Sequence, residues 1–152
     1  MKLEKLNQWL SFAANVGVLL GIVFLVLEMQ QNTAAVQSAT VQAITDSSAD
    51  ALHAVALYPD LAQLRVKGEE DYGSLSDIER FQFGYYTRAR WIRMQSIFIQ
   101  NELGVLQENI WSSYYRIICN DIVKAGIRDT WVLHKLVLEP EFIVVVESCI
   151  DA

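Results

Sequence analysis

A stretch of nineteen residues without a formal charge, from Trp9 to Leu27, constrains this chain more than any other feature. As a helix it would be about 28 Å long, close to the hydrocarbon thickness of a bilayer. A soluble core helix would show a polar face every three or four residues, whereas residues 16–27 are only Val, Leu, Ile, Phe and Gly. The sequence therefore predicts a transmembrane helix over residues 9–27, after a short N-terminal tail of residues 1–8.

Two other fates of this apolar run fit less well. A secretory signal has an apolar region of about 7 to 15 residues, followed closely by a small-residue cleavage site. The best such site, Thr33-Ala34-Ala35, lies well beyond the run. A buried helix of a soluble protein is the third alternative, and the missing polar face argues against it. We expect the span to be retained in the membrane.

The basic residues near the span all precede it. Lys2 and Lys5 lie in the tail, and the next basic residue is Arg65. Because basic residues close to a span favour the cytoplasmic side, we expect a cytoplasmic N-terminus. In a single-pass protein of the bacterial inner membrane, residues 28–152 would then lie in the periplasm.

The part of the chain after the span is acidic. The full sequence has 12 basic and 18 acidic residues. Without Lys2, Glu4 and Lys5, ten basic and seventeen acidic residues remain, a net charge of −7. This balance argues against nucleic acid as a partner and against a polybasic contact with anionic lipid.

Residues 28–58 predict a helical extension of the span. They contain neither Gly nor Pro, and apolar residues such as Val36, Ile44 and Val55 recur at a helical spacing. The first half is rich in uncharged Gln, Asn and Thr residues. Such a helix is either an ordinary connection to the next domain or a surface that contacts copies of itself.

Residues 59–152 predict a helical bundle domain, which makes the fold class all-α. Ser76 and Glu79 have the spacing of a capping box, and Pro59 and Gly68 are typical of a helix start and a helix end. We expect helices over residues 59–68, 76–102, 107–124 (closed by Gly126) and 128–136. The segment after Pro140, EFIVVVESCI, is rich in β-branched residues, which leaves a strand open there.

The aromatic residues of this domain predict its core. We expect Trp111, Tyr115, Trp131 and Phe142 to be buried together. The two cysteines, Cys119 and Cys149, leave two alternatives open: a disulfide in an oxidising compartment, or two buried free thiols that act as small apolar residues.

Motifs for catalysis or cofactor binding are not evident in the sequence. The two histidines, His53 and His134, have no Cys or carboxylate neighbours at ligand spacing, so no metal site is predicted. No glycine-rich phosphate loop and no nucleophile motif occurs. We therefore expect no cofactor and a protein that is not an enzyme.

An arginine cluster stands out in the stretch YYTRARWIRMQ, residues 85–95. Arg88, Arg90 and Arg93 fall within six residues, and on a helix Arg90 and Arg93 are neighbours. Arginine supplies forked donors for phosphate and carboxylate groups, so one interpretation is an anion site for a lipid headgroup or a phosphorylated metabolite. The more ordinary interpretation is intramolecular pairing with some of the carboxylates of the chain.

The transmembrane helix itself carries two contact faces. Gly17 and Gly21 form a GxxxG pattern that Ala13 extends by one turn, and small residues at this spacing let membrane helices approach closely. Ser11 and Asn15 form a polar stripe on the opposite side. An asparagine in a bilayer needs a polar partner, so these five residues predict a homo-oligomer whose spans are in contact.

Three segments together resemble a known type of protein. They are LNQWLSFAANVGVLLGIVFLVLEMQQNTAAVQ, GVLQENIW, and GIRDTW followed by PEFIVVVE. Most of the chain resembles a loose group of uncharacterised bacterial single-span membrane proteins with an all-helical domain of unknown function. The resemblance implies membrane anchoring and an all-α fold, and it transfers no catalytic residue.

Two functional hypotheses follow from these patterns. The first is a membrane-anchored, self-associating helical protein with a scaffold or interaction role; its partners would be the lipid bilayer and copies of itself, and further protein partners are unknown. The second is an oligomeric membrane pore, lined by Ser11 and Asn15, or a sensor of a small anion or lipid through the arginine cluster.

Overall fold

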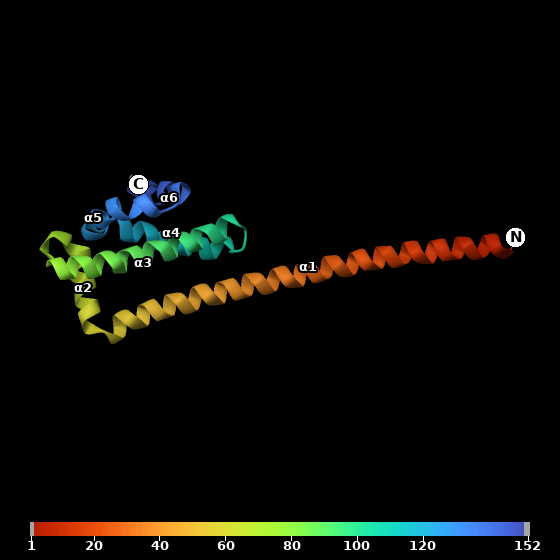
Figure 1. Ribbon diagram of the computed structural model, residues 1–152, viewed down its shortest axis with the longest axis horizontal. Helices are drawn as coiled ribbons and strands as arrows, with labels where there is room; N and C mark the ends of the chain where they lie inside the picture. The colour runs from red at the N-terminus through yellow and green to blue at the C-terminus, as the bar shows by residue number, and fades with distance from the viewer. Residues whose placement is uncertain (1, 151–152) are drawn as a thin grey trace. The chain divides into compact units, whose positions relative to one another are not determined.

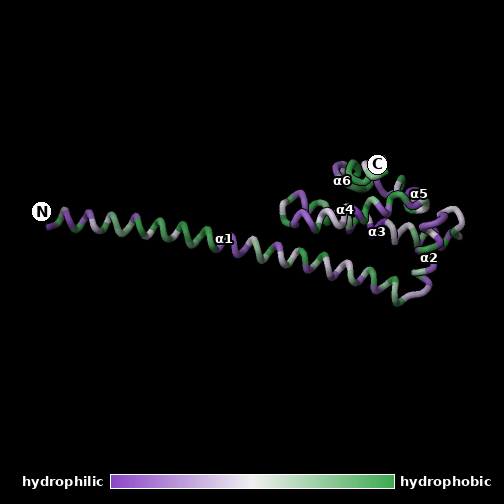
Figure 2. Tube along the Cα trace, turned by 180° about the vertical axis from the view of Figure 1, so that it is seen from behind, coloured by the Kyte–Doolittle hydropathy of each residue, from purple (hydrophilic) through white to green (hydrophobic). Residues whose placement is uncertain are grey.

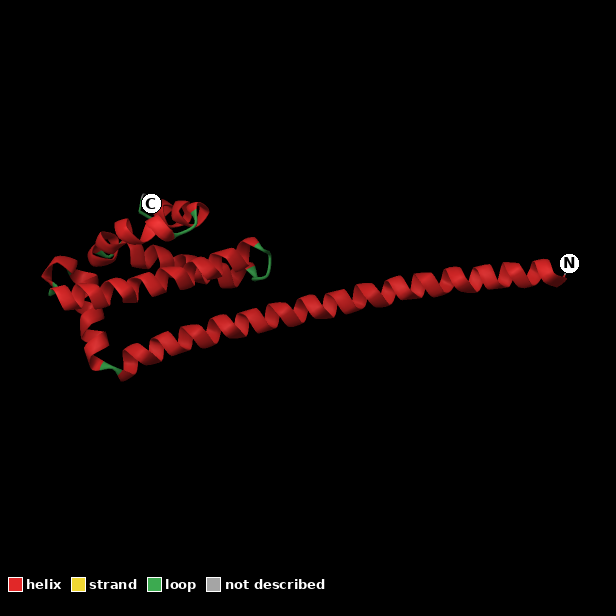
Figure 3. Cartoon of the chain, in the orientation of Figure 1, coloured by secondary structure: helices red, strands yellow, loops and turns green. Residues whose placement is uncertain are grey.

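The computed structural model describes residues 2–150, and this part of the chain consists of helices and short loops without a strand (Figure 3). The all-α fold class is thus confirmed. Along the chain, the elements are α1 (Lys2–Leu57), α2 (Pro59–Glu70), η1 (Tyr72–Ser74), α3 (Asp77–Glu102), α4 (Glu108–Ile122), α5 (Ala125–His134), η2 (Lys135–Val137) and α6 (Pro140–Ser148), where η1 and η2 are short 3-10 helices (Figure 1).

Helix α1 is continuous through the predicted span and its extension, as the lack of Gly and Pro after the span predicts. Its first part, up to Ala39, is one structural unit, and the chain from Thr40 is a second. Within the described residues, α1 is the one helix long and apolar enough to cross a membrane. Its apolar run is visible between the N-terminus and the middle of α1 in Figure 2.

The last turns of α1 belong to the second unit. Val41 and Ile44 are partly buried against its core, and the Ser48 Oγ and Tyr114 Oη atoms are 2.9 Å apart. The sequence placed the start of the domain at residue 59. In the structure the domain begins earlier, because one face of the predicted extension packs against the bundle.

Helix α3 is the central helix of the second unit. Its buried residues recur every three or four positions, which gives a single buried face; they are Phe83, Thr87, Trp91, Met94, Ile97 and Phe98. Helix α4 runs back along α3 after a tight loop (Figure 1). In that loop Gly104 has φ +69°, the left-handed conformation common just after a helix end.

The predicted capping box starts α3. The Ser76 hydroxyl accepts a hydrogen bond from the Glu79 amide at 3.4 Å, and the Glu79 carboxylate accepts one from the Ser76 amide at 2.7 Å. These bonds, with a further one from Lys67, lower the pKa of Glu79 to about 2. The end of α3 at Glu102 also agrees with the prediction.

Aromatic rings fill the core between α3, α5 and α6. The ring centroids of Trp91 and Trp131 are 4.8 Å apart, and those of Phe98 and Phe142 are 5.6 Å apart. The predicted burial of Trp131 and Phe142 is confirmed, with 2% and 0% of their surfaces exposed. The predicted burial of Tyr115 is wrong.

Tyr115 is 37% exposed, and Trp111 is only partly buried against the core. The two side chains lie one turn apart on α4, with ring centroids 6.1 Å apart. The buried face of α4 carries Ile118 and Ile122 instead. The two aromatic rings therefore lie toward the edge of the core, where Trp111 still contacts Phe98 at a centroid distance of 5.8 Å.

Two glycines have a different role from the predicted one. Helix α2 continues past Gly68 to Glu70, and Gly126 lies in the first turn of α5 instead of closing α4. A Cβ atom on Gly126 would overlap the carbonyl oxygen of Gly68, and one on Gly68 would lie 2.5 Å from the ring of Phe83. Both glycines are buried, so they permit close packing of helices where the sequence suggested helix ends.

The C-terminal segment is a helix, and the strand left open there is absent from the described residues. Pro140 occupies the start of α6, and Phe142 and Val146, four residues apart, face the core. Directly after α6, Cys149 forms a disulfide with Cys119 of α4, with Cα atoms 5.0 Å apart. Of the two alternatives for the cysteines, the structure has the disulfide.

Candidate functional site

The five residues predicted to mediate oligomerisation are all exposed. Ser11, Ala13, Asn15, Gly17 and Gly21 lie in the first unit, where α1 is a single helix with exposed sides. A Cβ atom added to either glycine would meet no other atom within 4 Å. The GxxxG face and the polar stripe are therefore both available for contacts with other molecules.

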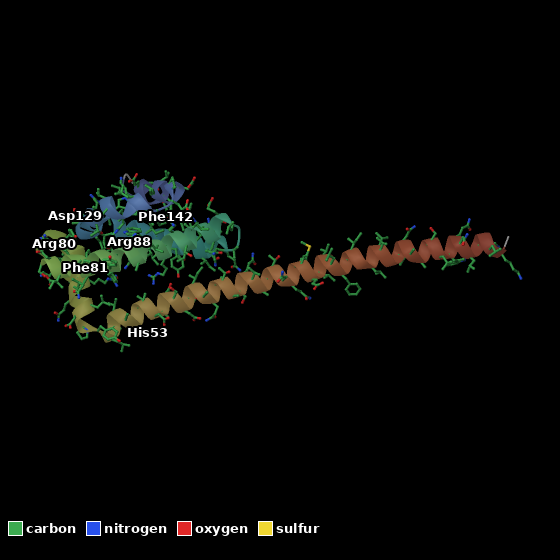
Figure 4. The ribbon with its side chains drawn as sticks, in the orientation of Figure 1. His53, Arg80, Phe81, Arg88, Asp129 and Phe142 are labelled. Atoms are coloured by element: carbon green, nitrogen blue, oxygen red, sulfur yellow. A yellow bond between two sulfur atoms is a disulfide. The ribbon has the colours of Figure 1, made fainter. Side chains whose placement is uncertain are left out.

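The predicted arginine cluster is divided between two pockets of the second unit. Arg88 borders one pocket between α3 and α5, and Figure 4 shows it on α3, with Arg80 and Phe81 labelled on the same helix. Arg90 and Arg93 border another pocket, between α3, α2 and the end of α1. The structure thus brings two of the three arginines together and separates the third.

The pocket at Arg88 has a volume of about 270 Å³ and a largely apolar wall. Two exposed rings, Phe81 and Tyr85, form part of it. Arg80 also borders it, but its guanidinium donates a hydrogen bond to the Gly73 carbonyl at 2.9 Å and lies 3.7 Å from Asp77. Arg80 is thus occupied by contacts within the chain.

His134 lines the same pocket. Its Nε2 atom is 2.8 Å from the Thr87 hydroxyl, and both residues are buried. Burial lowers the pKa of His134, and the positive charge of Arg88 lowers it further. A neutral imidazole paired with a hydroxyl in this setting stabilises the packing of α5 against α3.

The second pocket has a volume of about 320 Å³, and three arginines line it. Arg65 of α2 and Tyr86, Arg90 and Arg93 of α3 form its polar side. Its apolar side consists of short side chains from α1, α2 and α3, namely Ala51, Leu52, Ala54, Leu61 and Ala89. We call this cavity the arginine pocket.

A network of ion pairs holds the polar side of the arginine pocket in place. Arg65 Nε lies 2.8 Å from one oxygen of Glu69, and Lys124 Nζ lies 2.7 Å from the other. Lys124 also reaches Asp121 at 3.3 Å, and Asp121 pairs with Arg90. These contacts outweigh the effect of partial burial and lower the pKa of Glu69.

Arg93 differs from the other cations of the arginine pocket. Its guanidinium donates a hydrogen bond to the Ser47 carbonyl at 3.2 Å, but no carboxylate of residues 2–150 forms an ion pair with it. Partial burial lowers the pKa of Arg93, and the adjacent charge of Arg90 adds to this effect. The Nε atoms of Arg90 and Arg93 are buried without an acceptor.

Several residues of this site were not singled out in the sequence. Arg65 and Glu69 are four residues apart on one helix, and that spacing alone could have paired them. Asp121 comes from the end of α4, 31 positions after its partner Arg90, and Lys124 precedes α5, 55 positions after its partner Glu69. No local pattern points to them, because the contacts arise only when the helices pack.

Over residues 2–150, the fold and the site define an all-α protein with one helix apolar enough to cross a membrane and a helical domain with an arginine-lined pocket. Within the described residues, no group of three or more His, Cys, Asp or Glu side chains could hold a metal ion. No protein-family model, curated protein or solved structure matches the chain. The resemblance to bacterial single-span proteins stays a prediction.

Proposed function

We propose that this is a membrane-anchored protein that self-associates through its transmembrane helix and serves as a scaffold or interaction module, with no catalytic role. The observation that supports it most is the exposure of every residue from 9 to 27 on a helix of membrane-spanning length. Among the described residues, the first unit contains only this helix, so lipid or another protein chain would cover its faces in a bilayer.

The two faces of the helix favour copies of the same chain as those molecules. Gly17 and Gly21 have no side chains, which lets two backbones approach and gain dispersion contacts and weak hydrogen bonds in place of lipid contacts. On the other side, an Asn15 amide left unpaired in hydrocarbon would cost several kcal/mol. Copies of the chain on the two sides of the helix would supply complementary groups, one copy to each face.

The proposed location of the helical domain is the periplasm of a bacterium, with the span in the inner membrane. Lys2 and Lys5 before the span favour a cytoplasmic N-terminus. The Cys119–Cys149 disulfide supports the proposal, since such bonds persist in oxidising compartments. Alkaline phosphatase fused after Ala152 is expected to be active, and a green fluorescent protein at the same position dark; the reverse pattern would contradict this orientation.

Self-association can be tested with labelled protein in vesicles of neutral lipid. Donor- and acceptor-labelled copies of the wild type should show energy transfer that rises with the protein-to-lipid ratio. Gly17→Leu and Gly21→Leu should reduce it, because the added bulk forces the helices apart. The matched control is Val23→Leu, which adds a methylene to the same helix more than about 100° away from both glycines.

The result that contradicts the proposal is equally specific. Energy transfer that stays at the level expected for random proximity would show that the spans do not associate. An equal loss for Val23→Leu and for the glycine variants would show that the GxxxG face is not the contact.

A further inference from the structure

The arginine pocket contains more positive than negative charge. Its network holds four cations, Arg65, Arg90, Arg93 and Lys124, and only two carboxylates, those of Glu69 and Asp121. Two positive charges are therefore left uncompensated within the network. The domain as a whole is acidic, so this local excess is not a consequence of its composition.

The network is also short of hydrogen-bond acceptors. Glu69 accepts from Arg65 and Lys124, and Asp121 accepts from Lys124 and pairs with Arg90, so each of the four carboxylate oxygens already contacts a cation. Arg93 has a backbone carbonyl as its acceptor. The phenol oxygen of Tyr86 accepts a bond from Arg90 at 3.3 Å, which leaves the phenol proton free to donate.

Keeping cations together in a partly buried site costs free energy unless an anion compensates them. Arg93 carries this cost without an ion pair. A phosphate or carboxylate group in the pocket would supply both the missing charge and the missing acceptors. Arginine is the residue best suited to such a group, because its planar fork can donate two parallel hydrogen bonds.

The remainder of the pocket limits what the anion can carry. A volume of about 320 Å³ is at the small end of the range for ligand pockets. Ala51, Leu52 and Leu61 give one side an apolar surface. The site therefore fits a charged head with a short apolar part.

We propose that the arginine pocket is a binding site for a phosphate monoester with a small apolar substituent, held mainly by Arg93 with Arg90 and Tyr86. The ester belongs to a free metabolite or to a lipid headgroup, since the two share this chemistry. All residues of the pocket lie in the second unit, so the proposal goes beyond the proposed self-association and does not depend on it.

The test is calorimetric titration of the full-length protein in an uncharged detergent. Butyl phosphate is expected to bind with one site per chain. It should bind several-fold more tightly than inorganic phosphate, because the butyl group removes apolar surface of the pocket from water. The absence of saturable binding of butyl phosphate would overturn the proposal.

Variants assign the binding to this pocket. Arg93→Gln should weaken the binding of butyl phosphate about tenfold or more, as expected for the loss of a charged hydrogen-bonding partner. The matched control is Arg88→Gln, which removes the same charge from the same helix but faces the other pocket. Binding unchanged in Arg93→Gln, or weakened equally in Arg88→Gln, would contradict the assignment.

A second variant keeps the test valid if Arg93→Gln disturbs folding. Ala89→Leu narrows the pocket without changing its charge, and leucine is a good helix former. It should abolish the binding of butyl phosphate while circular dichroism shows unchanged helicity. Binding at the wild-type level in Ala89→Leu would overturn the proposal.

Competition distinguishes the two sources of the ester. Protein reconstituted in phosphatidylcholine vesicles is titrated with butyl phosphate, with and without phosphatidic acid in the bilayer. A lower apparent affinity with phosphatidic acid, absent in Arg93→Gln, supports the site and assigns it to a lipid headgroup. An unchanged affinity supports the site and assigns it to a free metabolite.

Discussion

Replacing both Cys119 and Cys149 with alanine removes a link between α4 and the end of α6. The bond closes a loop of 30 residues. Restricting the unfolded chain over a loop of that length stabilises the folded state by about 3.6 kcal/mol in the chain-entropy model. A domain of this size has a total stability of about 5–15 kcal/mol, so the link supplies a substantial part of it.

The assay is urea unfolding of the full chain in a mild detergent, followed by tryptophan fluorescence. Trp91 and Trp131 lie in the core at 2% exposure each and report on its unfolding. With a denaturant slope of about 1.5–2 kcal/mol per molar urea, the double variant should unfold at a urea concentration about 2 M lower than oxidised wild type. Wild type treated with dithiothreitol should behave like the variant.

A thiol titration of the denatured wild type provides the control. We expect no free thiol before reduction and two after it. Two free thiols before reduction would contradict the disulfide and weaken the argument for a periplasmic domain. No free thiol together with equal unfolding midpoints for wild type and variant would refute the loop-closure reasoning, since the bond would then exist without stabilising the domain.

Three further predictions concern packing, pH and the span. Gly126→Ala should destabilise the domain by about 1–3 kcal/mol in thermal unfolding, because the added Cβ atom would overlap the backbone of α2. Gly84→Ala should stabilise the domain by a few tenths to about 1 kcal/mol, because the space around Gly84 is open. The pKa of His134 in the folded state is below its ordinary value of 6.5, so the domain should be most stable above pH 6.5 and lose stability as the pH falls through the folded-state pKa. Arg88→Gln should raise the pKa of His134 in an NMR titration. An unchanged pKa would contradict the role of the Arg88 charge. If the protein is a scaffold, the Asn15→Leu variant should still form oligomers, as measured by cross-linking in vesicles. If the wild type conducts ions and Asn15→Leu loses this conductance, the pore hypothesis would be favoured.

The sequence predicts the helices well where local signals dominate. Helix α1 runs through to Leu57 because no residue before Pro59 breaks it. Helix α3 begins and ends as predicted, since Ser76 caps its start and Gly104 takes a left-handed conformation after its end. In each case the residues that determine the boundary lie within one turn of it.

The differences arise where a contact between helices sets the outcome. A glycine at a helix end and a glycine at a helix crossing look alike in the sequence, so the close approach of Gly68 and Gly126 could not be read from either position. The β-branched run after Pro140 suits a strand as well as a helix. It is helical in the structure because Phe142 and Val146 reach the core four residues apart.

In the candidate site, too, the sequence predicts what depends on local geometry and misses what depends on contacts between helices. Helical geometry alone places Arg93 beside Arg90 and turns Arg88 about 200° away from Arg90, which agrees with the two separate pockets. The ion pair between Arg90 and Asp121 joins residues on different helices, and no periodicity predicts it. The uncompensated charge of the arginine pocket therefore becomes visible only in the folded domain.

The mass of the wild-type protein in detergent tests self-association, the central claim, most directly. Light scattering with the detergent contribution subtracted gives the number of chains per particle, and it should be measured over a range of concentrations in several uncharged detergents. We predict particles with two or more copies of the 17.3 kDa chain. A single chain per particle at every concentration and in every detergent would contradict both the scaffold and the pore.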